Sequence, residues 1–230
     1  MPLLGSAAMA LFFDLADEAI AEHDDWHTHE HVPERISIPG FLRASRWAAP
    51  RGGPRYFILY EVADLDVLTS SAYLERLNNP TPWTAKMMQS YRGMRRGLCR
   101  VEATCGLGIG QAALCISFSP VAGEEQALRE WLARRLLPDL ASRPGLASAH
   151  LLASGTSAPM TREQQIRGKD AETSWVLLVT GYSAMSVTQL HEGELRGEAL
   201  VSAGVAPGPV ANIYQLEYSL SEAELRRAAP

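Results

Sequence analysis

Four of the six histidines in the chain lie within the run HDDWHTHEH, which begins at His23. Imidazole is the side chain whose ordinary pKa lies closest to neutral pH, so histidine serves both as a metal ligand and as an acid or base in proton transfer. His23, His27 and His31 are four residues apart and would share one face of a helix, whereas His29 would lie off that face. The run therefore indicates a metal site, a proton-transfer site or a solvated helix face.

A metal site needs several ligands that converge on one ion. His27 and His31 have the spacing that lets two imidazoles share an ion, and Glu30 or Glu34 could supply a third ligand. However, HTHEH does not match the HExxH motif, and no second cluster of His, Cys or Asp stands out in the sequence. His23 and His31 would lie about 12 Å apart along a helix that rises ~1.5 Å per residue. We therefore predict no metal.

Proton transfer needs one histidine of suitable pKa and a group that orients it. We predict that His31 is the general base or acid, because Pro33 follows it closely and ends or kinks the helix there. His27 would be a second proton carrier or hydrogen-bond donor, and Glu30 an orienting carboxylate. Arg46, on the strand that follows, would stabilise a developing oxyanion and would lie on the opposite strand face from Trp47.

Polar and aromatic side chains around this helix could line a pocket for a flat, apolar ligand. The residues that we predict to bind such a ligand are His23, Trp26, Tyr56, Tyr60, Trp83 and Tyr91. Aromatic residues are more often plain core residues, so simple packing is the alternative for each of them.

An internal repeat indicates which way the histidine face points. WHTHEHVPERISIPGF aligns without a gap with WLARRLLPDLASRPGL, 105 residues later, with five identities in sixteen positions. In this alignment His23, His27 and His31 correspond to Leu128, Leu132 and Leu136. Leucine on that face predicts contact with a core. Histidine in its place predicts a cavity or a polar network, in the first half only.

Each half also reads as strand, helix, strand, strand, helix, strand. The expected strands are AMALFFDL, FLRASRWAA, RYFILYEVAD and GLCRVEAT in the first half, and AALCISFS, LASAHLLAS, SWVLLVTGYS and NIYQLEYS in the second. The expected second helices are DLDVLTSSAYLERL, continuing into KMMQSYRGMRR, and SVTQLHEGELRGEAL. The second half inserts SGTSAPMTREQQIRGKDAE, which we expect to be a longer loop.

This order is that of the ferredoxin-like fold, in which two helices cover one face of a four-stranded antiparallel sheet. We predict an α+β protein with two tandem βαββαβ repeats that pack sheet to sheet as an intramolecular dimeric α/β barrel. Repeat 1 would span residues 7–106 and carry the site, and repeat 2 would span 111–220 and serve as scaffold. Only the short connector TCGLGIGQ lies between the halves, which argues against two separate domains.

Composition excludes several other classes of protein. Hydrophobic residues make up 47% and the net charge is -5, as in an ordinary globular protein. Four arginines, at positions 92, 95, 96 and 100, are only a weak signal for nucleic-acid binding. We do not expect the protein to bind nucleic acid. Three cysteines without ligand spacing indicate reduced thiols. No apolar run approaches the ~20 residues of a membrane span, and we expect a cytoplasmic monomer or homodimer.

The run W-x4-H-x-P-x5-PG, formed by Trp26, His31, Pro33, Pro39 and Gly40, resembles the first-helix signature of the EthD-type branch of dimeric α/β-barrel proteins. In that signature the aromatic residue precedes the histidine by four positions rather than five. The longer run DWHTHEHVPERISIPGFLRASRW, with NPTPW later, is similar to a tandem-repeat bacterial subgroup. The superfamily includes cofactor-independent monooxygenases, isomerases, cyclases, dehydratases and haem-binding enzymes, so the resemblance implies the fold and leaves the reaction open.

We therefore expect a cofactor-independent enzyme that acts on a small aromatic or unsaturated metabolite by histidine-mediated proton transfer. It would be an isomerase, a cyclase or a dehydratase-type lyase. One alternative is a haem protein with His27 or His31 as the axial ligand. The other is a non-catalytic module that binds a small molecule.

Overall fold

Eight strands close on themselves into an antiparallel barrel, in the order β1-β3-β2-β9-β5-β8-β6-β4 and back to β1. The computed structural model describes residues 3–154 and 160–228. The elements of the first half are β1 (Ala7–Leu15), η1 (Asp17–Ala19), α1 (Ile20–Trp26), the π-helical turn η2 (His27–His31), α2 (Val32–Ile36), β2 (Phe41–Ala48), β3 (Tyr56–Val62), η3 (Leu65–Thr69), α3 (Ser71–Asn78), α4 (Pro82–Met88) and β4 (Tyr91–Gly106).

The second half repeats this order, with an additional helix and a short strand before its third long strand. Its elements are β5 (Ala112–Phe118), α5 (Glu125–Trp131), the π-helical turn η4 (Leu132–Leu136), α6 (Leu137–Ser142), β6 (Leu146–Ser154), α7 (Arg162–Arg167), β7 (Ala171–Glu172), β8 (Trp175–Gly181), α8 (Ala184–Glu192), α9 (Gly197–Ser202), β9 (Val210–Ser221) and α10 (Glu222–Ala228). The predicted α+β barrel of two ferredoxin-like repeats is confirmed.

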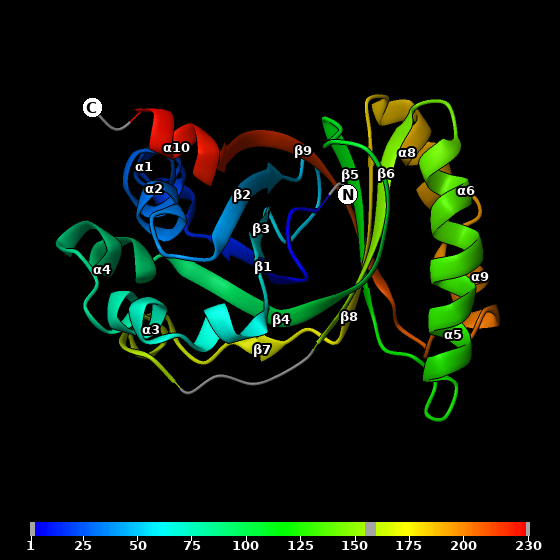
Figure 1. The fold of residues 1–230 in the computed structure, drawn as a ribbon, viewed down its shortest axis with the longest axis horizontal. Helices are drawn as coiled ribbons and strands as arrows, with labels where there is room; N and C mark the ends of the chain where they lie inside the picture. The colour runs from blue at the N-terminus through cyan, green and yellow to red at the C-terminus, as the bar shows by residue number, and fades with distance from the viewer. Residues whose placement is uncertain (1–2, 155–159, 229–230) are drawn as a thin grey trace.

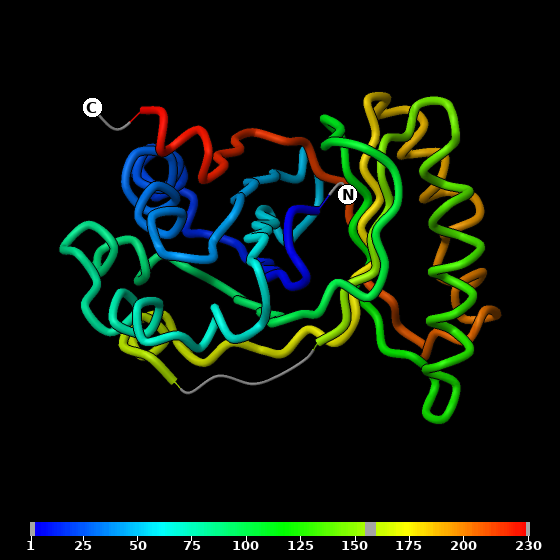
Figure 2. The backbone as a smooth tube through the Cα atoms, viewed as in Figure 1, coloured from blue at the N-terminus to red at the C-terminus, as the bar shows by residue number. Residues whose placement is uncertain are grey.

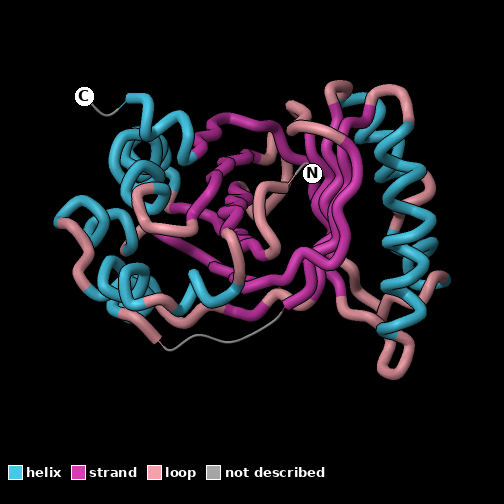
Figure 3. Tube along the Cα trace, viewed as in Figure 1, coloured by secondary structure: helices cyan, strands magenta, loops and turns pink. Residues whose placement is uncertain are grey.

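The helices form two outer layers with the strands between them (Figure 1). Helices α1 to α4 and α10 lie on one side, and α5, α6, α8 and α9 on the other, as Figure 3 shows with helices in cyan and strands in magenta. Strand alternation separates the cores: Tyr56, Ile58 and Tyr60 of β3 face the first helix layer, whereas Phe57 and Leu59 face the barrel interior. Packed side chains from both halves fill that interior.

The first helix of each half contains a π-helical turn at equivalent positions, η2 and η4. Pro33 and Pro138 lie at the start of the α-helix that follows each turn. Proline lacks an N–H group, and its ring crowds the carbonyl four residues earlier, which explains a widened turn just before it. Because the leucine-lined copy has the same turn, the π-helical geometry belongs to the repeated fold and not to the histidines.

Three predicted elements were wrong in detail. The second helix of the first half does not continue through Arg96, because α4 ends at Met88 and β4 begins at Tyr91, where it pairs with β1. Gly93 has a positive φ of 60°, which does not fit a helix. The segment from Asp64 to Leu77 is divided at Ser70, whose hydroxyl accepts a hydrogen bond from the Tyr73 amide and caps α3. Likewise, the predicted helix over 186–200 is broken at Gly193 between α8 and α9.

The insert of the second half is more than a loop in its described part, residues 160–172. It contains α7, which packs against α3 and α4 of the first half, and β7, which pairs in parallel with β4 at Arg95 and Arg96. Figure 2 shows this part of the trace, in yellow, running along the first half before it joins β8. The second half therefore contributes residues to the helix layer of the first.

The cysteines and the cluster of four arginines lie on strands of the barrel. Cys99, Cys105 and Cys115 are free thiols. The arginines at 92, 95, 96 and 100 all lie on β4. Within residues 3–154 and 160–228, no helix is long and apolar enough to cross a membrane.

Candidate functional site

The histidine face of the first helix is buried against the sheet. His23, His27 and His31 are 0%, 1% and 7% exposed, whereas His29 is exposed. Their counterparts in the second half also point inward, since Leu128 and Leu132 are buried and Leu136 is partly buried in the core there. The inward direction predicted from the repeat is confirmed, and a solvated helix face is excluded for these three histidines.

His23 has a protein partner on each ring nitrogen. Its Nδ1 lies 3.1 Å from Asp24 Oδ1, and its Nε2 lies 3.2 Å from the Tyr91 hydroxyl. A carboxylate only accepts hydrogen bonds, so the proton belongs on Nδ1 and the Tyr91 hydroxyl donates to Nε2. Burial lowers the pKa of His23, against the opposing effect of Asp24. With both nitrogens satisfied, His23 holds the cluster together and has no free group for a ligand.

Asp24 is a residue of this cluster that sequence reasoning missed. Its Oδ1 also accepts a hydrogen bond of 2.8 Å from the Tyr56 hydroxyl. Burial opposes its negative charge, but the hydrogen bonds from His23 and Tyr56 outweigh burial and lower its pKa. The sequence did hold one signal for Asp24: it is an acidic residue directly after His23, the first histidine of the stripe formed by His23, His27 and His31.

Arg46 lies on the predicted face of β2 but at the His23 end of the stripe. Its Nη1 donates hydrogen bonds of 3.1 Å to the Asp24 carbonyl and to Thr28 Oγ1, and its Nε donates one of 3.2 Å to Glu217. Trp47, next along the strand, packs in the barrel interior. Arg46 is therefore used to fix α1 on the sheet, and it does not line the cavity beside His31.

His27 and His31 differ from His23 because each has a buried Nδ1 that finds no hydrogen-bond partner among residues 3–154 and 160–228. Nε2 of His27 lies 3.5 Å from the Tyr60 hydroxyl, a long contact. Burial is the main cause that lowers the pKa of both histidines well below the ordinary value, and positive charge on Arg35 adds to it. Both imidazoles are therefore neutral at pH 7, and both have a ring nitrogen that is free to exchange a proton or accept a hydrogen bond.

The aromatic residues of the cluster surround these rings. The His27 ring lies 5.3 Å from that of His23 and 5.6 Å from that of His31, and the Trp26 ring lies 4.3 Å from that of His31. Tyr56, Tyr60 and Tyr91 are buried in the same core cluster, with their hydroxyl groups on Asp24, His27 and His23. Four predicted aromatic residues are thus brought together with the stripe.

Glu30 and Trp83 lie elsewhere. Glu30 Oε1 accepts hydrogen bonds of 3.1 Å from Trp26 Nε1 and 2.6 Å from Thr81 Oγ1, so this carboxylate joins the first helix to α4 and does not orient His31. Trp83 is only half-buried, and its Nε1 donates a hydrogen bond of 3.1 Å to Glu22 at the surface. Both residues stabilise the packing of α4 on α1.

A cavity of about 20 Å³ adjoins His31. It is lined by Met9, Leu11, Arg35, Tyr60, Tyr73, Leu77, Arg96, Thr161, Glu163 and Arg167. Such a volume holds about one water molecule. Since Thr161, Glu163 and Arg167 belong to the α7 region, the insert of the second half closes the cavity, and a larger ligand needs that segment to move. Sequence reasoning missed these residues because they lie more than a hundred positions beyond the histidines.

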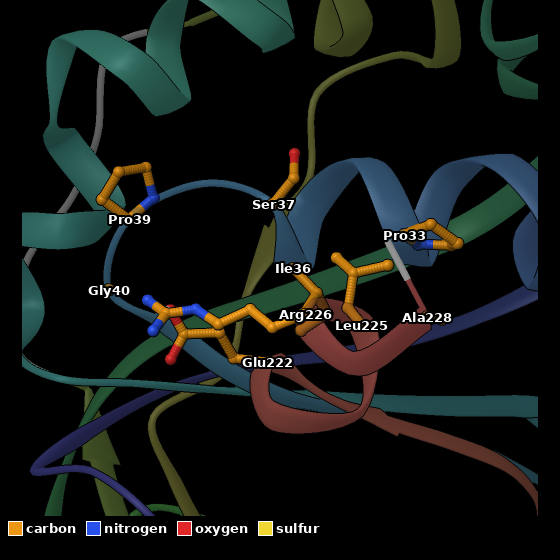
Figure 4. A pocket seen from close by; sticks show the side chains of 9 residues that line it. All are labelled: Pro33, Ile36, Ser37, Pro39, Gly40, Glu222, Leu225, Arg226 and Ala228. Carbon is orange, nitrogen blue, oxygen red and sulfur yellow. The ribbon is translucent and has the colours of Figure 1, made fainter. Parts of the chain in front are cut away.

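A wider groove, of about 650 Å³, lies apart from the buried histidines (Figure 4). It runs between α2, the turn before β2 and the C-terminal helix α10, and its walls include Pro33, Ile36 and Leu225. At its rim Arg226 is paired with Glu222 at 2.5 Å. No histidine lines this groove, so volume and chemistry point to different places, and the buried cluster is the better candidate for a reaction.

The described side chains fit neither a metal ion nor haem. Within residues 3–154 and 160–228, no group of three His, Cys, Asp or Glu side chains is placed to hold a metal ion. For haem, His27 and His31 offer ring nitrogens, but the adjoining cavity of about 20 Å³ is far too small for a porphyrin. The residues as arranged do not fit the group.

His150 of β6 provides a contrast inside the barrel. Its Nδ1 lies 2.8 Å from Thr104 Oγ1 and its Nε2 lies 3.0 Å from Ser148 Oγ, and burial lowers its pKa to about 3. The adjoining space is only about 10 Å³. A buried histidine with a partner on each nitrogen and almost no adjoining space is a structural residue, and His27 and His31 differ from it in their unpartnered Nδ1 atoms.

Solved structures share the α+β barrel fold of this chain. No family model matches it, and no curated protein matches it in sequence. Among solved structures, an anthrone oxidase-like protein has a TM-score of 0.69 and 14% identity, over 100% of this chain and 99% of that one. A candidate monooxygenase from Fusobacterium nucleatum has a TM-score of 0.63 and 10% identity, over 95% and 96%. Another from Lactobacillus acidophilus has 0.59 and 9%, over 94% and 96%. At these identities the likeness establishes the fold alone.

Proposed function

We propose that the first half is an active site that removes a proton from carbon in a small aromatic or otherwise unsaturated substrate. The observation that supports this most is the pair of buried, neutral imidazoles with unpartnered Nδ1 atoms, on a face where the second half has leucine. A buried polar atom without a partner costs about 1–3 kcal/mol. The second half packs the equivalent helix face with leucine, which carries no such cost. Packing alone therefore does not explain the histidines of the first half.

In this proposal His31 accepts the proton, because it is the histidine that adjoins the cavity. Neutral imidazole becomes imidazolium, and the substrate becomes an enolate or a related delocalised anion. Arg35 lines the same cavity, so it replaces Arg46 as the cation that stabilises this negative charge. His27, whose ring is next in the stack, would orient His31 or take up the proton in turn.

The later fate of the anion decides the reaction class. Return of the proton to another carbon is isomerisation, and loss of a leaving group is the lyase reaction. The structural neighbours favour a third course, since one is anthrone oxidase-like and two are candidate monooxygenases. There the anion reacts with O2, so that a CH2 group becomes C=O and the second oxygen atom leaves as water. All three courses begin with the same proton abstraction.

The family assignment within the barrel proteins is part of this proposal. The motif residues Trp26, His31, Pro33, Pro39 and Gly40 favour the EthD-type branch. We also propose that the repeats are bounded as 7–106 and 111–220 and that the second serves as scaffold, with one site per chain.

Deuterium incorporation tests the proton abstraction whichever of the three courses follows it. Anthrone and phenylpyruvate, two unsaturated carbon acids, would be incubated in D2O without oxygen, and loss of the C–H signal would be followed by proton NMR. We expect the protein to accelerate exchange for at least one probe, and His31→Leu to abolish the acceleration while His29→Leu, on the exposed side, retains it. Equal exchange in the wild type and His31→Leu would contradict the proposal. Admission of oxygen then distinguishes oxygenation by the appearance of a quinone or keto product.

A further inference from the structure

The side chains that line the cavity beside His31 include more cations than anions. Arg35, Arg96 and Arg167 line it, against a single carboxylate, that of Glu163. Arg167 has its own partner outside the lining, Asp170, at 2.7 Å. Arg96 is less well satisfied within the described part of the chain: its Nε donates to the sulfur of Met9 at 3.4 Å, and its Nη2 is buried there without a hydrogen-bond partner. An unpaired guanidinium N–H in a buried position indicates a place for an anionic acceptor.

The carboxylate that lines the cavity is that of Glu163, which lies on α7 in the insert of the second half. Glu163, which is 2% exposed, accepts a hydrogen bond from Nη2 of Arg35, which is 1% exposed. Nη1 of Arg35 donates to Glu34 at 3.0 Å, so the guanidinium has one acid from its own helix and one from α7. A carboxylate on a buried arginine is the arrangement by which proteins recognise carboxylate ligands.

The segment that carries Glu163 packs on α3 and α4, but few hydrogen bonds among the described residues join it to the first half. Helix α7 has only six residues, too few to be stable without tertiary contacts. The amide of Arg162 donates to Asn78 Oδ1 at 3.1 Å, and β7 adds two residues of parallel pairing to β4. Movement of α7 by a few ångströms would therefore expose Arg35 and enlarge a cavity that now holds about one water molecule.

We propose that this site binds a small unsaturated carboxylic acid, whose carboxylate replaces that of Glu163 on Arg35 and also bonds to Nη2 of Arg96. The unsaturated part of the ligand then lies against Tyr60 and Tyr73, with its acidic carbon beside His31. This inference deepens the proposed function and depends on it for the reaction, whereas carboxylate binding stands on the arginines alone. Glu163 acts as the counter-ion of the site when no substrate is bound.

Binding of benzoate tests the inference, with benzamide as the neutral molecule of the same shape. Isothermal titration calorimetry of the wild type should detect benzoate but not benzamide. Arg96→Gln should weaken benzoate about tenfold, the effect of losing one charge-assisted hydrogen bond. Glu163→Gln should lower the melting temperature without ligand, because Arg35 loses its partner, and benzoate should then raise the melting temperature of this variant by more than it raises that of the wild type.

Glu61→Gln is the matched control. Glu61 is 1% exposed and accepts a hydrogen bond of 2.6 Å from Arg43, so the variant also breaks an arginine–glutamate pair whose carboxylate is buried, but one beside a space of about 10 Å³. We expect lost stability that benzoate does not restore. No binding of benzoate, equal binding of benzamide, or equal binding by Arg96→Gln would overturn the inference even if Glu163→Gln fails to fold.

The two proposals can fail separately. If benzoate binding needs Arg96 but deuterium exchange is unaffected by His31→Leu, the carboxylate site is supported and the proposed proton abstraction is contradicted. If deuterium exchange of anthrone needs His31 but benzoate does not bind, the proton abstraction is supported and a carboxylic acid is contradicted as the substrate.

Discussion

At the scale of single residues, each buried histidine can be assigned by what its two ring nitrogens contact. His23 and His150 have a partner on both nitrogens and are structural. His27 and His31 each have an Nδ1 without a partner among the residues that the structure describes. The sequence could indicate that the three histidines of the stripe face inward, because the second half has leucine there. It could not separate His23 from the other two, since that depends on where Asp24 and Tyr91 lie in space.

The difference predicts opposite effects of the same substitution. His31→Leu should stabilise the protein by about 1–3 kcal/mol, because it removes a buried atom without a partner and restores the residue type of the second half. His150→Leu should destabilise it by a similar amount, since Thr104 and Ser148 would lose their shared partner. Urea unfolding at pH 7 measures both. A loss of stability in His31→Leu would mean that its ring is better satisfied than its contacts indicate.

At the scale of elements, α7 is the part that sequence reasoning could least anticipate. The pair of Arg35 and Glu163 joins residues 128 positions apart, and the composition of the insert is typical of a loop. By contrast, strand alternation correctly placed Arg46 opposite Trp47, and the repeat correctly placed both first helices. Short-period patterns and internal homology are visible in a sequence, whereas the docking of an insert on another repeat is not.

Loosening α7 should change access to the site more than it changes global stability. Asn78→Ala removes the hydrogen bond of 3.1 Å to the amide of Arg162 at the start of α7. We expect faster amide exchange in α7 by hydrogen-exchange mass spectrometry, with a melting temperature close to that of the wild type. Asn79→Ala is the control, because the Asn79 side chain bonds only locally, to the Glu75 carbonyl at 3.0 Å. Equal protection of α7 in the two variants would show that other contacts hold it.

At the scale of the whole molecule, two sheets packed face to face leave a filled interior, and the candidate site lies between one sheet and its helix layer. The barrel core combines Phe12 and Trp47 of the first half with Leu152 and Tyr214 of the second. The fold class followed from the sequence because both halves repeat one order of elements. The reaction does not follow from the fold, since structures at 9–14% identity share this architecture under different names.

Burial of neutral histidines also gives the whole molecule a pH dependence. His23, His27, His31 and His150 all have lowered pKa values in the folded state, so the unfolded chain binds more protons below its ordinary histidine pKa of about 6.5. Stability should be flat from pH 8 to 7 and should fall below 6.5, by up to ~1.4 kcal/mol per pH unit for each histidine.

Urea unfolding between pH 5.5 and 8 measures this slope, and His27→Leu combined with His31→Leu should remove about half of it. Over this window Glu34 and Glu61, whose pKa values burial raises, act in the opposite direction and reduce the net slope. A stability that does not change between pH 7 and 5.5, or the same slope in the double variant, would show that the stripe is not buried in neutral form.

The pH profile of deuterium incorporation tests the central claim most directly, that a neutral, buried His31 removes a proton from the substrate. Because the pKa of His31 lies well below its ordinary value, the rate in the wild type should stay constant from pH 8 through 6.5 and fall only at lower pH, and His31→Leu should show no enzymatic rate at any pH. A profile that falls by half near pH 6.5 would indicate a solvent-exposed histidine. A profile unchanged by His31→Leu would contradict the account.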